Sequence, residues 1–118
     1  MSLRILVAED HARLADFCVE FLLTLGHRVI GPVPSMQKAR DLISHETIDA
    51  AYLDVRLNDG LVFPLATELR TRNIPFFFCT GYGEDAEMPP DFDQVPRLSK
   101  PYTEDDLASL LNSLFAAR

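Results

Sequence analysis

The stretch Ile48-Asp49-Ala50-Ala51-Tyr52-Leu53-Asp54 contains a nearly continuous apolar run that ends at an acidic residue. A run of this kind is typical of a strand that is buried on both faces, as in a parallel sheet covered by helices. Three other apolar runs also end at polar residues: 3–8 at Glu9-Asp10, 74–79 at Thr80, and 98–99 at Lys100. If the four runs are parallel strands of one sheet, three carboxylates, a hydroxyl and an ammonium gather along a single edge.

Helical stripes of apolar residues separate these runs, which is the pattern of βα units on a parallel sheet. One stripe predicts a helix over residues 12–25 that Gly26 ends. Further helices are expected after Ser35, around Pro64, and after Thr103, which forms a near-capping box with Asp106. Residues 28–31 are expected to form an additional short strand, broken by Pro32 and Pro34.

This alternation predicts an α/β fold of the flavodoxin-like, doubly wound type, with five parallel strands and about five helices on its two faces. In the strand order 2-1-3-4-5, which the pattern alone does not fix, ligands bind beyond the carboxyl ends of strands 1 and 3. Glu9, Asp10 and Asp54 fall at that point. The fourth helix is expected to be short or replaced by a loop, because residues 81–94 contain Pro89-Pro90, which a helix cannot cross without losing hydrogen bonds.

The length of 118 residues and the ordinary apolar content predict one globular domain, residues 1–118, with no output domain. The net charge of −7 and the lack of a basic run argue against binding to nucleic acid or to an anionic membrane. The sequence has no signal-peptide pattern, so a cytoplasmic location is expected. Cys18 and Cys79 are expected to be buried free thiols.

The polar edge has a chemical interpretation. Three neighbouring carboxylates repel one another and lose solvation, and a hard cation such as Mg²⁺ would relieve both effects. Asp54 could then attack phosphorus and form an acyl phosphate, with Thr80 donating its hydroxyl to a phosphoryl oxygen. Lys100 could pair with Asp54 before transfer and with the phosphate afterwards. Each residue alone has a commoner structural explanation, such as a helix N-cap for Asp10, but coincidence of the whole set is improbable.

The sequence resembles the response-regulator receiver domains over essentially its whole length. The resemblance rests on Glu9-Asp10, Asp54, Thr80 and Lys100-Pro101 in the order and approximate spacing of that family. It implies that Asp54 is the phosphoacceptor and that Asp10 binds Mg²⁺ directly, with Glu9 acting mostly through water. It also implies that the backbone carbonyl of Arg56 is a metal ligand and that the Lys100-Pro101 bond is cis.

Arg97 stands where many receivers carry an aromatic residue that moves inward on phosphorylation. Together with residues 75–82, this makes the sequence similar to the single-domain "FAT GUY" receivers, which lack that aromatic residue. A replacement switch is therefore expected to involve Tyr82, Arg97 or Pro101, with a hinge at residues 81–83. Arg56 and Tyr82 are further expected to slow the hydrolysis of the phosphoryl group by flanking the path of water.

The resemblance implies a stand-alone two-component response regulator that takes phosphate from a histidine kinase or a histidine phosphotransfer protein. It would signal through a protein partner or act as a phosphate shuttle or sink, catalysing only its own phosphorylation and dephosphorylation. A degenerate receiver that works without phosphorylation is the main alternative. An aspartate-nucleophile phosphohydrolase would need a second aspartate at Arg56, and a flavin binder would need a phosphate-binding loop at Glu9-Asp10-His11.

Overall fold

The computed structural model describes residues 2–81 and 88–116. Its centre is a five-stranded, fully parallel sheet in the order β2-β1-β3-β6-β7, which is the predicted order 2-1-3-4-5 counted along the chain. The strands are β1 (Arg4–Ala8), β2 (Arg28–Val33), β3 (Ala50–Asp54), β6 (Phe76–Thr80) and β7 (Arg97–Ser99). The flavodoxin-like, doubly wound fold is thus confirmed.

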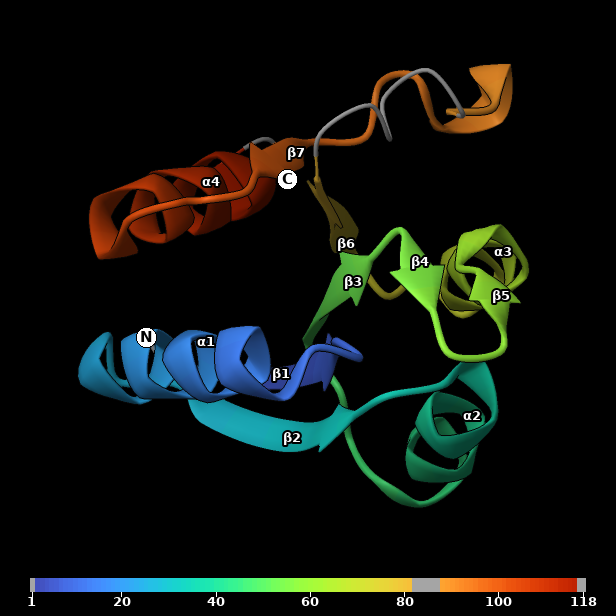
Figure 1. The fold of residues 1–118 in the computed structure, drawn as a ribbon, viewed down its shortest axis with the longest axis horizontal. Helices are drawn as coiled ribbons and strands as arrows, with labels where there is room; N and C mark the ends of the chain where they lie inside the picture. Colours follow the sequence, from blue (N-terminus) through green and yellow to red (C-terminus); the bar gives the residue numbers. More distant parts are fainter. Residues whose placement is uncertain (1, 82–87, 117–118) are drawn as a thin grey trace.

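Four α-helices in the described residues cover the two faces of the sheet (Figure 1). They are α1 (Ala12–Thr24), α2 (Met36–His45), α3 (Phe63–Thr71) and α4 (Glu104–Ala116). The helices α1 and α4 lie on one face, and α2 and α3 lie on the other. None of the helices in the described part of the chain combines the length and the apolar character that crossing a bilayer requires.

The predicted helix starts are largely confirmed. The Ser35 hydroxyl accepts a hydrogen bond from the Lys38 N–H at 3.2 Å, and Thr103 and Asp106 form a reciprocal capping box at 2.9 and 3.1 Å. At α1 the N-cap is His11 rather than Asp10, because the His11 imidazole accepts from the Leu14 N–H at 3.4 Å. The Asp10 carboxylate is therefore not required to cap the helix.

The predicted end of the second strand is wrong. β2 continues through Pro32 to Val33, and the Gly31-Pro32 peptide bond is cis. β2 is an edge strand with β1 as its one neighbour in the sheet, so a proline without an N–H group is tolerated there. Pairing resumes beyond it, because the Glu9 N–H donates to the Val33 carbonyl at 3.0 Å. This bond fixes the backbone of Glu9 at the edge of the sheet.

A small hairpin that the sequence did not predict follows β3. It consists of β4 (Arg56–Leu57) and β5 (Gly60–Leu61), joined by a turn at Asn58-Asp59. The Asp59 carboxylate accepts from the N–H groups of Met36 and Gln37 at 2.8 and 3.2 Å, so the hairpin caps the start of α2. The turn therefore ties the loop after Asp54 to the neighbouring helix.

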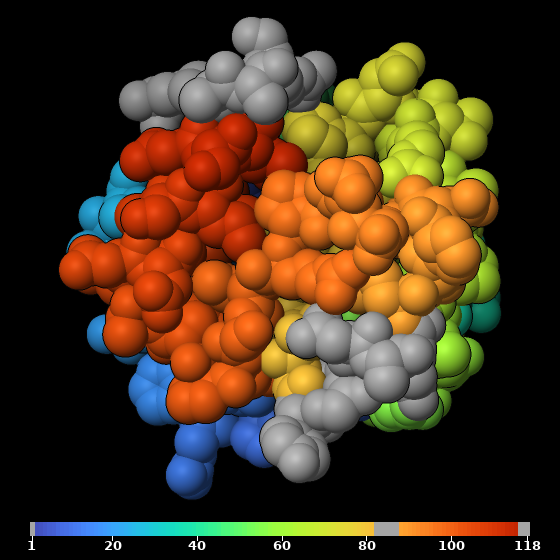
Figure 2. Space-filling view, turned by 90° about the horizontal axis from the view of Figure 1, so that it is seen from above, coloured from blue at the N-terminus to red at the C-terminus, as the bar shows by residue number. Residues whose placement is uncertain are grey.

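Residues 88–96, between β6 and β7, contain one 3-10 turn, Pro90–Phe92, and no α-helix. This agrees with the prediction for the fourth helix as far as the structure describes the segment. The Arg70 guanidinium lies 4.6 Å from the ring centre of Phe92, and its Nη1 donates to the Asp91 carbonyl at 3.0 Å. In Figure 2 this segment, drawn in orange, lies beside α4, drawn in red.

The two faces of the sheet are packed with different side chains. We call the α2–α3 side the phenylalanine face, because its centre is a cluster of four phenyl rings: Phe63, Phe76, Phe78 and Phe92. We call the α1–α4 side the tyrosine face, because it contains two tyrosines and two thiols among its apolar residues: Tyr52, Tyr102, Cys18 and Cys79. Both cysteines are buried and free, as predicted.

Candidate functional site

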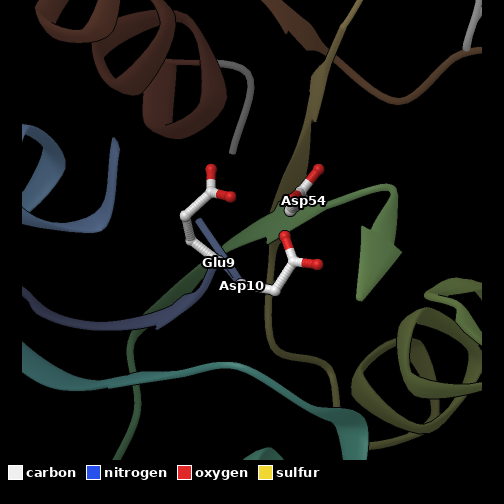
Figure 3. A group of neighbouring side chains, drawn as sticks. All are labelled: Glu9, Asp10 and Asp54. Carbon is white, nitrogen blue, oxygen red and sulfur yellow. The ribbon is translucent and has the colours of Figure 1, made fainter. Parts of the chain in front are cut away.

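Three carboxylates meet at the carboxyl edge of the sheet (Figure 3). Asp54 is the last residue of β3, and Glu9 and Asp10 directly follow β1, which is the neighbour of β3. One carboxylate oxygen from each of the three residues lies within 4.8 Å of the others. The structure thus brings together the acidic residues that the sequence singled out.

The members of this acidic cluster differ in their exposure to solvent. Glu9 and Asp54 each retain 3% of their accessible surface, whereas Asp10 is exposed. Buried ionised carboxylates are unfavourable unless they are paired or hydrogen-bonded. Glu9 and Asp54 therefore need partners, and Asp10 marks the side of the cluster that opens to solvent.

Lys100 supplies the first partner. Its ammonium group lies 3.1 Å from Oδ1 of Asp54 and 3.1 Å from Oε1 of Glu9. The Lys100-Pro101 peptide bond is cis, as the family resemblance implied, and Lys100 directly follows β7. One cation is thus shared between two buried acids that come from different strands.

These contacts shift the pKa values of the paired groups. Burial, together with the neighbouring carboxylate of Glu9, raises the pKa of Asp54 to about 8, although Lys100 acts in the opposite direction. Burial alone would lower the pKa of Lys100, but the charges of Asp54 and Glu9 outweigh it and raise that pKa. Lys100 therefore stays protonated, but its single positive charge does not fully stabilise the ionised form of Asp54.

Glu9 accepts two further hydrogen bonds that the sequence analysis missed, and a third bond extends one of them to Tyr102. The Tyr52 hydroxyl donates to Oε1 of Glu9 at 3.1 Å, and the Tyr102 hydroxyl donates to that of Tyr52 at 3.1 Å. The His11 N–H donates to Oε2 of Glu9 at 3.2 Å. Strand alternation was the available signal for Tyr52, because it lies two residues before Asp54 and so shares its face of the sheet.

The remaining predicted residues take the following places. Thr80 is the last residue of β6, is 2% exposed, and accepts a backbone hydrogen bond from the Lys100 N–H at 2.8 Å. Arg56 lies in the hairpin directly after the site. Arg97 starts β7, and its guanidinium lies 3.4 Å from the Asp93 carboxylate, whereas Tyr82 falls outside the described residues.

Pro101 does not lie in the acidic cluster. It lines a separate groove of about 270 Å³ beside α1, together with Leu14, Phe17, Phe21 and Tyr102. Phe17 is 47% exposed there, although it is a large apolar side chain. Tyr102 therefore borders this groove, while its hydroxyl donates to the Tyr52 hydroxyl, which in turn donates to Glu9.

The donor atoms of the acidic cluster fit a divalent cation. All are hard carboxylate oxygens, which suit Mg²⁺ or Ca²⁺ better than the softer transition metals. The raised pKa of Asp54 shows that Lys100 alone does not balance the negative charge of the cluster. A site with two or three carboxylates and an open side is the arrangement in which Mg²⁺ keeps several waters.

Comparison with known proteins supports the family resemblance. No family model matches the sequence. The solution structure of SdrG from Sphingomonas melonis Fr1 is 36% identical, covers 96% of both chains and superposes with a TM-score of 0.86. A curated relative, the regulatory protein VanRc of Enterococcus gallinarum, is 36% identical over 88 residues, and the match spans 74% of this chain but 38% of that protein.

Two more distant structures share the fold. The PhyR response regulator receiver domain of Erythrobacter litoralis is 19% identical, with coverage of 98% and 91% and a TM-score of 0.87. The receiver domain of a sensor histidine kinase from Pseudomonas aeruginosa PAO1 is 23% identical, with coverage of 98% and 99% and a TM-score of 0.84, and is described with a magnesium ion in its active-site cleft. This chain belongs to the response-regulator receiver domains of two-component systems.

Proposed function

We propose that this receiver domain accepts a phosphoryl group on Asp54. The observation that carries the proposal is the position of that carboxylate, buried at the end of β3, 3.1 Å from Lys100 and beside two further acids. A structural aspartate in a sheet would not be expected to lie in contact with a second buried acid without a reason of this kind.

Mg²⁺ is the proposed cofactor. Glu9, Asp10, Asp54 and the backbone carbonyl of Arg56 would hold it, and its charge would offset the three carboxylates and the incoming phosphoryl oxygens. The acidic cluster and the magnesium ion of the Pseudomonas receiver domain support this assignment.

The transfer itself uses groups of this chain. A carboxylate oxygen of Asp54 attacks phosphorus in line, and its new bond forms as the bond from phosphorus to the donor nitrogen breaks. The product is an acyl phosphate, and the donor imidazole leaves with the electron pair of the broken bond. Asp54 must be ionised for this step, and Lys100 favours the ionised form.

Two groups are proposed to hold the phosphoryl group after transfer. Thr80 ends the strand next to β3 and would donate its hydroxyl to one phosphoryl oxygen. Lys100 would exchange its contact with Asp54 for a second phosphoryl oxygen, while it retains its contact with Glu9. The shared position of Lys100 supports this exchange, since loss of one partner leaves it paired.

The proposed phosphoryl donor is a histidine kinase or a histidine phosphotransfer protein, because the chain belongs to the receiver family. The proposed output is binding to a partner protein or removal of phosphate from the donor. Interactions with nucleic acid or membrane are not part of the proposal, given the net charge of −7.

The test is intact mass after incubation with acetyl phosphate, in Mg²⁺ and in EDTA, for the wild type and for Asp54→Asn. One added phosphoryl group is expected for the wild type in Mg²⁺. None is expected for Asp54→Asn in Mg²⁺ or for either protein in EDTA. The matched control is Asp59→Asn, which removes a carboxylate from the nearby hairpin and should leave phosphorylation intact. Equal phosphorylation of Asp54→Asn would refute the assignment of the acceptor.

If acetyl phosphate modifies no sample, the same four conditions are repeated with a purified histidine kinase in its phosphorylated form. Transfer of phosphate to the wild type alone supports the proposal. A failure with both donors favours the alternative of a receiver that acts without phosphorylation.

A further inference from the structure

A line of two hydroxyl groups runs from a surface groove to the acidic cluster. The Tyr102 ring borders the groove beside α1, and its hydroxyl donates to the Tyr52 hydroxyl at 3.1 Å. The Tyr52 hydroxyl in turn donates to Oε1 of Glu9 at 3.1 Å. The Tyr52 oxygen therefore accepts from Tyr102, and Oε1 of Glu9 accepts from Tyr52.

The surroundings of these hydroxyls are apolar. Tyr52 is fully buried on the tyrosine face, with the Phe77 ring at 5.7 Å and the Tyr102 ring at 6.2 Å between centroids. A phenylalanine would fill nearly the same volume at position 52 without bringing a polar atom into the core. The hydroxyl of Tyr52 is therefore not needed for packing, and it donates a hydrogen bond to a residue of the acidic cluster.

Oε1 of Glu9 is shared between two donors. It accepts from the Tyr52 hydroxyl at 3.1 Å and lies 3.1 Å from the Lys100 ammonium. The two donors compete for the same oxygen, so the hydroxyl weakens the ion pair between Glu9 and Lys100. The ammonium group then interacts about equally with Glu9 and with Asp54, whose Oδ1 also lies at 3.1 Å. The hydroxyl also fixes the orientation of the Glu9 carboxylate, whose other oxygen is held by the His11 N–H.

We propose that Tyr52 and Tyr102 are positioning residues of the metal and phosphoryl site, with Tyr52 acting on Glu9 and Tyr102 acting through Tyr52. This inference rests on the proposed function, because it assigns a purpose to a carboxylate of the proposed Mg²⁺ site. Partners that orient metal-binding side chains commonly change metal affinity by about tenfold to a hundredfold when they are removed. Neither tyrosine touches the phosphoryl group in the proposal.

The experiment is calorimetric titration of the unphosphorylated protein with Mg²⁺, for the wild type, Tyr52→Phe, Tyr102→Phe and the double variant. Tyr52→Phe is expected to raise the Kd for Mg²⁺ by about tenfold or more. Tyr102→Phe should raise it by about two- to tenfold, since it removes one neutral hydrogen bond at a distance from Glu9. The double variant should match Tyr52→Phe within about twofold.

This lack of additivity separates positioning from a general loss of structure. If the tyrosines only support the core, their effects on the Kd are absent or multiply in the double variant. The matched control is Phe78→Leu, which alters the core on the other face and leaves every donor to Glu9 in place. It should lower the thermal stability while its Kd for Mg²⁺ stays within about twofold of the wild type.

The outcomes distinguish the two proposals. A wild type that binds no Mg²⁺ and gains no phosphate overturns the proposed function, and the positioning role with it. A wild type that does both, with unchanged Kd values in the tyrosine variants, overturns the positioning role alone. If Tyr52→Phe does not fold, as judged by circular dichroism, Tyr102→Phe decides: a Kd within twofold of the wild type refutes the role of the pair.

Discussion

The phenylalanine face and the tyrosine face of the sheet are both well buried, but they differ in the polar atoms that they contain. The phenyl rings of Phe63, Phe76, Phe78 and Phe92 pack at 5.6–6.1 Å, mostly edge to face, and bring no polar side-chain atom into the core. The tyrosine face holds two hydroxyls and two thiols, and its hydroxyls lead to Glu9. The core of the tyrosine face therefore contains hydroxyls that are hydrogen-bonded to the acidic cluster, and the core of the phenylalanine face, within the described residues, does not.

This division follows from strand alternation. Val7, Tyr52 and Leu98 point to the tyrosine face, and the residues two positions further along are Glu9, Asp54 and Lys100. The three charged groups that contact one another thus continue the rows of side chains on that face. A substitution on the tyrosine face is therefore expected to alter the contacts among Glu9, Asp54 and Lys100 more than a substitution on the phenylalanine face does.

The largest expected effect comes from the centre of the phenylalanine face. Phe78→Ala removes a fully buried ring that contacts three other phenyl rings, and the loss in free energy of unfolding is expected to be about 3–5 kcal/mol. Urea denaturation measures this loss. The Kd for Mg²⁺, determined where the variant is still folded, should not change, and a tenfold change would break the distinction between the faces.

The next effect concerns pH and the acidic cluster. The folded-state pKa of Asp54 is raised to about 8, whereas the unfolded chain ionises near the ordinary value of 3.8. Between these values the unfolded state binds fewer protons, so this group makes the metal-free protein less stable as pH rises. Asp54→Asn stays neutral, so its advantage in Tm over the wild type should grow from pH 4 to pH 8 and then level off.

Thermal melts of both proteins in EDTA across this range test the prediction. Phe78→Leu is the matched control from the other face, and its difference from the wild type should not vary with pH in the same way. An advantage for Asp54→Asn that shrinks as pH rises would show that the pKa of Asp54 is lowered in the folded protein.

A smaller effect is expected where Arg70 holds the Pro90–Phe92 turn against the phenylalanine face. Arg70→Ala removes the cation–π contact with Phe92 and the hydrogen bond to Asp91, and should lower the free energy of unfolding by about 0.5–1 kcal/mol. Hydrogen exchange should speed up in the turn before it changes in the strands. Arg72→Ala, at an exposed position two residues away, should have no such effect.

The smallest effect is expected for the thiols of the tyrosine face. Burial raises the pKa of both Cys18 and Cys79 to about 12, so neither forms the reactive thiolate near neutral pH. Alkylation of the native protein at pH 8 should therefore proceed at the rate of unfolding events. If one cysteine of the folded protein is labelled fast, and low concentrations of urea do not raise its labelling rate, the tyrosine face opens locally rather than by global unfolding.

The sequence was sufficient to locate the strands, apart from the end of β2, and the charged members of the site. Runs of apolar residues located the strands, and the polar residue at the end of each run located Glu9, Asp54 and Lys100. Helix starts at Ser35 and Thr103 were predictable because each depends on a side chain and an N–H three residues apart.

Features that depend on distant contacts were not predictable. The extension of β2 to Val33 depends on its edge position, which follows from strand order rather than from residues 28–33. The hairpin after Asp54 is held by contacts between Asp59 and the start of α2, more than twenty positions away. The link from Tyr102 to Tyr52 spans 50 positions and joins residues that look like ordinary core aromatics in the sequence.

The line of hydroxyls also gives the protein an optical property. The chain has no tryptophan and three tyrosines, and two of these are Tyr52 and Tyr102. The near-ultraviolet absorption and emission of a phenol depend on the hydrogen bonds of its hydroxyl, and here one hydroxyl is bonded to a carboxylate of the acidic cluster. Binding of Mg²⁺ at the acidic cluster or modification of Asp54 is therefore expected to change the intrinsic tyrosine spectra, which need no label and no replaced residue.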